Sequence, residues 1–246
     1  MDVCRNEELL TQLNWRGPSP AASTTPPSVP SPSPIPDRCT FIKSTLATPA
    51  DFLLLSWLAC RLHAGEHVLL LHTARSRQHY VHVGRKWNVN VVAAEAAGQL
   101  TLVDAFTTLP DTATEPFTLH TQLINALQAA TRPLHLAIDD LTLLTLLTTP
   151  SSLHAFLSQL RTLSTSLLLI APSDIATQRP LHSQLSQWSD CLLSLSALRT
   201  GASREVDGVL EVVKRDVVTG VDRSRVVLFY RLQANGVQLS TKGAQT

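Results

Sequence analysis

The sequence is short of charged and aromatic residues, and these shortages exclude whole classes of protein. Only 16% of its 246 residues are charged, and 20 Lys and Arg against 19 Asp and Glu leave a net charge of +1. A chain without a basic excess lacks the electrostatic footprint of general nucleic-acid binding. Any role with nucleic acid must therefore be local or shared with partners.

Cysteines and long apolar runs are also scarce. The four cysteines, Cys4, Cys39, Cys60 and Cys191, lie far apart, which matches neither a zinc knuckle nor a disulfide-rich secreted scaffold. No apolar run approaches the roughly 18 residues that span a bilayer. The first ten residues, MDVCRNEELL, carry acidic side chains in place of a signal peptide's apolar stretch. We expect a soluble, intracellular protein with no membrane contact, in the cytoplasm or, as an alternative, also in the nucleus.

Signatures of catalysis are missing as well. No G-x-S-x-G element is present, and no Ser, His and Asp can be assigned to a catalytic triad. His79 and His82 lie one helical turn apart, but no neighbouring Cys, Asp or Glu completes a set of metal ligands. We therefore expect no enzyme activity and no metal site.

Three regions differ in composition. Residues 17–36 contain eight prolines among Ser, Thr and Ala, a composition typical of an extended linker or insertion. A docking peptide for an SH3-type domain is the alternative for this segment. We expect residues 1–16 to form a separate N-terminal segment and residues 37–246 to form the folded domain.

Within that domain, strand-like and helix-like segments alternate. Continuous apolar runs predict buried parallel strands at Cys39–Ile42, His67–His72, Gln99–Asp104, Leu134–Asp140 and Ser166–Ala171. Helical patterns lie at Asp51–Leu62, Ser76–Trp87, Thr118–Ala130 and Leu153–Leu163, and a short extended piece is expected at Val89–Val92. Such alternation predicts an α/β fold with a mostly parallel twisted sheet flanked by helices.

The end of the chain follows another pattern. Four strand-like runs follow one another with turn residues between them, at Cys191–Leu198, Val209–Lys214, Val226–Leu232 and Val237–Ser240. The pair Asn235-Gly236 is a strong hairpin signal. The sheet is therefore expected to finish in an antiparallel meander.

The segment KSTLATPAD, from Lys43 to Asp51, occupies the place of a phosphate-binding loop between the first strand and the first helix. It has no glycine, and Pro49 removes a backbone donor, so successive amides cannot easily turn toward a phosphate. Lys43 comes too early to reach the phosphates. Asp51, expected to cap the helix, adds negative charge where an anion would bind. We expect no functional P-loop and no bound cofactor.

Two carboxylates, Asp139 and Asp140, follow the predicted strand at Leu134. One interpretation is a residual magnesium site of the degenerate Walker-B type. The other is that these side chains cap the following helix or hydrogen-bond a neighbouring loop. Without a phosphate partner, the second interpretation is favoured.

One basic cluster and one charge-poor stretch suggest contact surfaces. The cluster comprises Arg75, Arg77, Arg85 and Lys86, interleaved with His79, Tyr80, His82 and Trp87. It could contact a phosphate backbone with an aromatic ring available for stacking, or it could be a solvated helix face. Between Leu141 and Ser173 the only formal charge is Arg161. Another subunit could cover this stretch, or Ser and Thr could keep it in water unaided.

Five segments resemble the family of the sixth subunit of the Elongator complex. They are SRQHYVHVGRKWNVNV (Ser76–Val91), GQLTLVDAF (Gly98–Phe106), LAIDDLTLLTLL (Leu136–Leu147), LRTGASREVDGVLEV (Leu198–Val212) and FYRLQANGVQLSTKGAQ (Phe229–Gln245). Each match is loose, but their order and spacing extend over most of the chain from Asp37 to Gln245. The proline-rich residues 17–36 have no counterpart expected in that family.

The resemblance implies a RecA-like fold without a working phosphate loop. It also implies assembly with the fourth and fifth Elongator subunits into a ring with two copies of each. That ring binds tRNA and supports the addition of 5-carboxymethyl-type groups to the wobble uridine, while a different subunit performs the chemistry. Two alternatives remain open: a divergent nucleotide hydrolase that uses Asp139 or Asp140, and a non-catalytic recombinase relative that acts on DNA.

Overall fold

The computed structural model describes most of the region expected to fold. It describes residue 13 and residues 38–105, 118–129, 132–175, 178–198, 205–216, 219–234 and 236–241. The proline-rich residues 17–36 lie outside these ranges. Leu13 is fully buried in the same core cluster as Trp57 and Tyr230. At least one side chain from before residue 37 therefore belongs to the core, which the expected boundary did not include.

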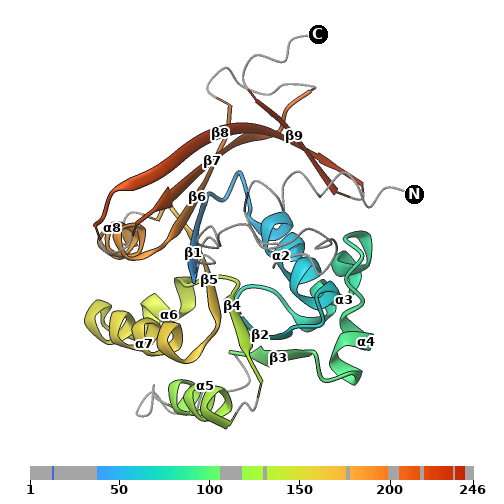
Figure 1. Cartoon of the computed structure of the whole chain (residues 1–246), viewed down its shortest axis with the longest axis vertical. Helices are drawn as coiled ribbons and strands as arrows, with labels where there is room; N and C mark the ends of the chain where they lie inside the picture. Colours follow the sequence, from blue (N-terminus) through green and yellow to red (C-terminus); the bar gives the residue numbers. More distant parts are fainter. Residues whose placement is uncertain are drawn as a thin grey trace, which may run out of the picture.

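A single nine-stranded sheet organises the chain, in the order β3-β2-β4-β5-β1-β6-β7-β8-β9 (Figure 1). The strands from β3 to β6 in this order run parallel to their neighbours, as predicted for buried apolar runs. These strands are β1 (Cys39–Ser44), β2 (His67–His72), β3 (Leu100–Asp104), β4 (Leu134–Ile138), β5 (Ser166–Pro172) and β6 (Cys191–Ser196). The predicted α/β class with a largely parallel sheet is confirmed.

An antiparallel meander completes the sheet, also as predicted. It consists of β7 (Gly208–Arg215), β8 (Asp222–Gln233) and β9 (Gly236–Thr241), and β6 pairs with both β1 and β7. Figure 1 shows these strands curving away at one end of the molecule. A side chain at Gly208 would meet the Tyr230 hydroxyl at 2.6 Å and the Ser196 carbonyl oxygen at 2.8 Å. Glycine is therefore required where β7 lies against its neighbours.

Helices cover both faces of the sheet and create two separate cores. On one face lie α2 (Asp51–His63), α3 (Arg77–Lys86) and α4 (Val91–Ala96); on the other lie α5 (Thr118–Ala129), α6 (Thr142–Leu147), α7 (Pro150–Leu163) and α8 (Arg179–Trp188) (Figure 1). Alternate residues of the central strands enter the two cores, so that in β1 Ile42 faces α2 while Phe41 faces α8. Because both faces are covered, most residues of the central strands are apolar.

Helix α2 shows why an unusually apolar sequence is needed at the centre. Its buried residues fall on almost every side, including Phe52, Leu55, Trp57 and Leu58. The helix lies between the parallel strands and the curved meander, where Phe52 stacks on Tyr230 with ring centroids 5.0 Å apart. The expectation of a helix enclosed on most sides is confirmed.

Three helices begin at polar N-cap residues of a type that can be recognised in the sequence. The side chains of Ser76, Asn90 and Thr149 accept hydrogen bonds from backbone amides in the first turns of α3, α4 and α7. The expected extended piece at Val89–Val92 is wrong, because the Asn90 cap starts the short helix α4 at Val91. Helix α7 begins at Pro150, before the expected Leu153, because Thr149 caps it and proline suits the first turn.

Asp51 does not cap α2 as expected. The N-cap residue is Ala50, which makes no side-chain hydrogen bond, and Asp51 is the first residue of the helix. Helix α8 was not expected at all. Among the helices of the described residues, none is long and apolar enough to cross a bilayer.

Candidate functional site

Ligands of open α/β sheets bind where neighbouring strands send their chains to opposite faces, at the carboxyl ends of those strands. Three neighbouring pairs meet this condition; in the pair β2–β3, part of the segment that follows β3 lies outside the described residues, and the other two pairs are β1–β5 and β2–β4. The chain leaves β1 toward α2 on one face, while its neighbour β5 leads to α8 on the other. Likewise β2 leads to α3 and its neighbour β4 leads to α6. We call these places the β1–β5 crevice and the β2–β4 crevice.

The carboxylate of Asp139 lies in the β2–β4 crevice. Its carboxylate accepts hydrogen bonds from the Thr73 amide at 2.6 Å, the Thr73 hydroxyl at 2.9 Å and the Tyr80 hydroxyl at 2.7 Å. The amides of Ala74 and Arg75 lie at 3.3 Å. Asp139 is 8% exposed and Tyr80 is 2% exposed. The carboxylate thus anchors the loop after β2, with its lone pairs directed at protein donors.

Asp140 serves the segment that follows it. Its Oδ1 accepts from the Thr142 amide at 2.7 Å, at the start of α6, while its carbonyl accepts from the Thr73 hydroxyl. Burial raises the pKa of Asp140, and the hydrogen bonds from Thr142 oppose this shift. The two aspartates therefore make the bonds that the second interpretation anticipated, one to the neighbouring loop and one to the following helix.

The segment after β1 closes on itself in the β1–β5 crevice. Thr45 and Thr48 form an isolated antiparallel bridge through both amides, at 3.3 and 3.1 Å, and their hydroxyls lie 2.6 Å apart. The Leu46 amide donates to Asp174 at 2.9 Å. Ser173 donates to the Ser44 carbonyl through both its amide, at 2.7 Å, and its hydroxyl, at 2.9 Å. These bonds join the segments that follow β1 and β5.

The N-terminus of α2 carries a paired acid. Arg75 Nη2 lies 3.4 Å from Asp51 Oδ2, and His79 Nε2 lies 3.8 Å from the same oxygen. Arg75 is therefore turned toward the helix start between the two crevices. Its positive charge is balanced there by a carboxylate of the chain.

The basic cluster is divided by its contacts. Arg77 makes two bonds to Glu95, from Nε at 3.1 Å and from Nη2 at 2.6 Å, while Arg85 and Lys86 are exposed at the end of α3. The expected stacking ring is not available, because Trp87 is 8% exposed and packs against Phe52, and Tyr80 is bonded to Asp139. Both rings are packed in the apolar core beneath α3.

The two histidines of α3 have separate surroundings. His82 Nδ1 lies 3.0 Å from the Gln78 carbonyl oxygen within its own helix, whereas His79 points toward Asp51. Across the described ranges, no group of three or more His, Cys, Asp or Glu side chains could hold a metal ion. No residue of this part of the chain is assigned to a metal.

The charge-poor stretch from Leu141 to Ser173 presents leucines at the surface. Leu146 is 76% exposed, and Leu147 and Leu163 are also exposed. Its single charge, Arg161, points inward: the guanidinium donates to the Trp188 carbonyl at 2.7 Å, pairs with Asp190 at 3.2 Å and lies over the Trp188 ring. The outer surface of α6 and α7 is therefore uncharged and partly apolar.

Sequence reasoning located Asp139 and Asp140 but missed their partners. Thr73 and Tyr80 lie 66 and 59 positions before Asp139 in the chain. A threonine directly after the buried strand β2 was an available signal, because polar residues at parallel strand ends meet at the same sheet edge. Tyr80 carried no comparable signal on an otherwise polar helix.

Comparisons with known proteins bear on the fold. Neither a protein-family model nor a curated protein sequence matches the chain. Among solved structures, the chain is similar to an uncharacterized protein, PH0321, from Pyrococcus horikoshii, solved in complex with an unknown peptide. The TM-score is 0.61 at 12% sequence identity, and the match covers 84% of this chain and 92% of that chain. At this identity the likeness supports the α/β fold alone.

Proposed function

We propose that this chain is a non-catalytic, RecA-like scaffold: the sixth subunit of an Elongator complex, assembled with the fourth and fifth subunits into a ring of two copies of each. In this role the ring binds tRNA and supports 5-carboxymethyl-type modification of the wobble uridine. The chemistry belongs to another subunit. The family part of the proposal rests on the sequence resemblance given above.

One observation supports the non-catalytic part. The β2–β4 and β1–β5 crevices are closed by the chain's own hydrogen bonds, through Asp139 in the first and through Thr45, Thr48 and Asp174 in the second. A carboxylate directed at five protein donors is poorly placed to bind magnesium. Amides that pair with carbonyls in a tight turn are not offered to phosphate oxygens.

The uncharged surface of α6 and α7 supports the assembly part. Exposed leucines without neighbouring charges are typical of a surface that another subunit covers. Because Arg161 points inward, this surface carries no charge that would lose water on association.

Co-expression with the fourth and fifth Elongator subunits of the same source organism tests the assembly. We expect the tagged full chain to purify with both in equal amounts, at a mass near that of a hexamer. A Leu146→Asp variant should weaken assembly without changing the melting temperature of the isolated chain. An isolated monomer that ignores both subunits would contradict the proposal.

Two further measurements address function and the alternatives. Deleting the gene should lower 5-carboxymethyl-type groups on wobble uridines, and unchanged levels would defeat the functional part. Titration with ATP and magnesium should show no saturable binding that depends on Asp139 or Asp140. Binding that is lost in Asp139→Ala and Asp140→Ala variants would favour the nucleotide hydrolase instead. A preference for single-stranded DNA over tRNA would favour the recombinase relative.

A further inference from the structure

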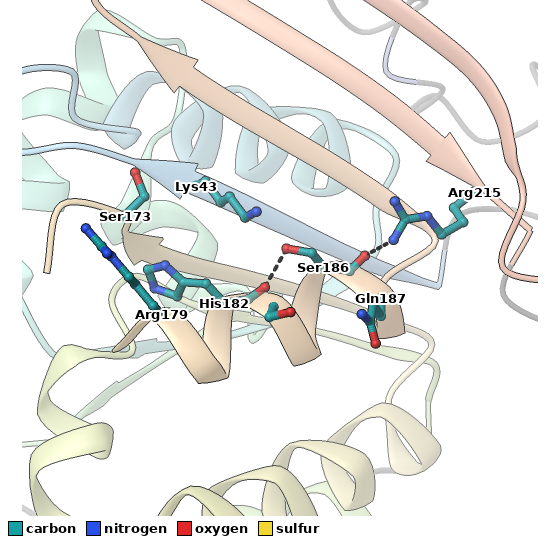
Figure 2. A pocket seen from close by; sticks show the side chains of 8 residues that line it. Lys43, Ser173, Arg179, His182, Ser186, Gln187 and Arg215 are labelled. Atoms are coloured by element: carbon teal, nitrogen blue, oxygen red, sulfur yellow. Dashed lines mark hydrogen bonds between the residues drawn. The ribbon is translucent and has the colours of Figure 1, made fainter. Parts of the chain in front are cut away.

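A polar groove of about 430 Å³ lies between α8 and the sheet and adjoins the β1–β5 crevice, where Ser173 donates to the Ser44 carbonyl. Figure 2 shows side chains from three separate parts of the fold lining it: Lys43 from β1, Arg179, His182 and Ser186 from α8, and Arg215 from the end of β7. Ser173, directly after β5, lies at the same end of the groove as Arg179 and Lys43. The volume is in the range of small-molecule sites.

The groove has an excess of positive charge. Lys43, Arg179 and Arg215 line it, and no Asp or Glu is among its lining residues. Arg215 is partly balanced, since its Nε lies 2.9 Å from Asp222, and its Nη1 donates to the Ser186 carbonyl. Among the described residues, Lys43 and Arg179 have no ion pair. Glu211, the carboxylate that acts on Lys43, is itself paired with Arg225.

The pKa values of Lys43 and His182 are both lowered, in part by this excess of positive charge. Burial, followed by the charge of Arg215, lowers the pKa of Lys43. Burial, followed by the charge of Lys43, lowers the pKa of His182. An anion in the groove would oppose both shifts, because it stabilises the protonated forms.

His182 supplies an observation that is independent of charge. It is 6% exposed, and its ring extends from α8 toward β1, with its centroid 5.8 Å from that of Phe41 (Figure 2). Its Nε2 is buried and has no hydrogen-bond partner within the described ranges. Buried polar atoms almost always have a partner, so this nitrogen points to a group that the chain itself does not supply.

We propose that this groove binds the phosphate group of a small molecule, with Lys43 and Arg179 neutralising its charge and His182 donating a hydrogen bond. Ammonium and guanidinium groups suit a tetrahedral oxyanion with several acceptor oxygens. The groove is open, and its lining includes no Phe, Tyr or Trp on which the bases of a single strand would stack. The site does not depend on the function proposed above.

Titration of the full chain in chloride buffer with inorganic phosphate and with pyrophosphate tests the site. We expect saturable binding that Lys43→Met and Arg179→Gln each weaken about tenfold. Arg85→Gln is the matched control, because Arg85 is exposed near the end of α3, which covers the face of the sheet opposite to α8. It should bind phosphate within about twofold of the parent, as expected for a charge far from the groove.

A second measurement follows His182 in the unmodified chain. Its imidazole resonances, assigned by comparison with the His182→Asn spectrum, should shift with phosphate concentration in an NMR titration. No saturable shift at millimolar phosphate would overturn the proposal, as would an equal loss of affinity in Arg85→Gln. If a single-stranded RNA binds through Lys43 while inorganic phosphate does not, the groove belongs to an RNA backbone and the small-molecule proposal is wrong.

Discussion

At Asp139, replacement by alanine would leave four donors without an acceptor, among them the buried Tyr80 hydroxyl, while the Thr73 hydroxyl would keep the Asp140 carbonyl. We expect Asp139→Ala to lower the free energy of unfolding by about 1–3 kcal/mol, the usual cost of unsatisfied buried donors. Urea unfolding followed by circular dichroism measures this change. Tyr80→Phe should lower the free energy of unfolding by less, because it removes the donor hydroxyl itself and leaves no buried donor without an acceptor.

The neighbouring Asp140 provides the control. In Asp140→Asn the amide oxygen can still accept from the Thr142 amide, so the loss should stay below about 1 kcal/mol. Equal losses at the two positions would contradict the assignment of Asp139 as the anchor of the loop after β2.

His135 makes stability depend on pH. Burial, followed by the charge of Arg61, lowers its pKa to about 4 from the ordinary 6.5, although Glu66 opposes the shift. Between these values the unfolded chain binds more protons than the folded one. Stability should therefore fall as the pH drops from about 6.5 to about 4, by at most about 1.4 kcal/mol per pH unit for this one proton.

Thermal melts at a series of pH values measure this effect. His135→Gln should flatten the fall without abolishing it, because burial also lowers the pKa of His182. If parent and variant lose stability in parallel below pH 6.5, His135 is not the group responsible.

At the scale of the element, α2 is the helix on which both the sheet and the meander depend. Leu55 is 1% exposed within it, and Leu55→Asp would bury an unpaired carboxylate. We expect a loss of several kcal/mol, a large share of the roughly 5–15 kcal/mol that stabilises a typical domain, measured as a lower melting temperature. Leu146→Asp, on the exposed side of α6, makes the same chemical change where water can reach it and should melt like the parent.

Elements with a strong pattern or a cap were predictable, and weaker ones were not. The apolar sequence of α2 and the HVLLLH strand match the structure within one residue. Helix α4 has only six residues, too few for a period of 3.6 to be recognised against a β-branched start. Helix α8 combines Pro180 with many polar residues, and its buried face becomes evident only where it packs on Phe41.

At the scale of the whole molecule, the core reaches beyond the domain expected from composition. Leu13 is fully buried beside residues of α2 and the meander. Leu13→Ala should lower the free energy of unfolding by about 2–5 kcal/mol, as for other buried leucines. Chemical denaturation measures it, with Leu46→Ala as the control at an 82% exposed leucine, and similar values for the two variants would argue against a packed N-terminal segment.

Local patterns in the sequence were enough to predict the fold class. Apolar runs separated by helices allow little other than a covered parallel sheet, and the last turn signals allow little other than a meander, because strand and helix periodicities act over a few residues. The pairing of Asp139 with Thr73 and Tyr80, the burial of Trp87 and the placement of Lys43, Arg179 and Arg215 along one groove arise only on folding. These contacts join positions far apart in the chain, and their geometry depends on strand order and helix packing, which no local pattern encodes.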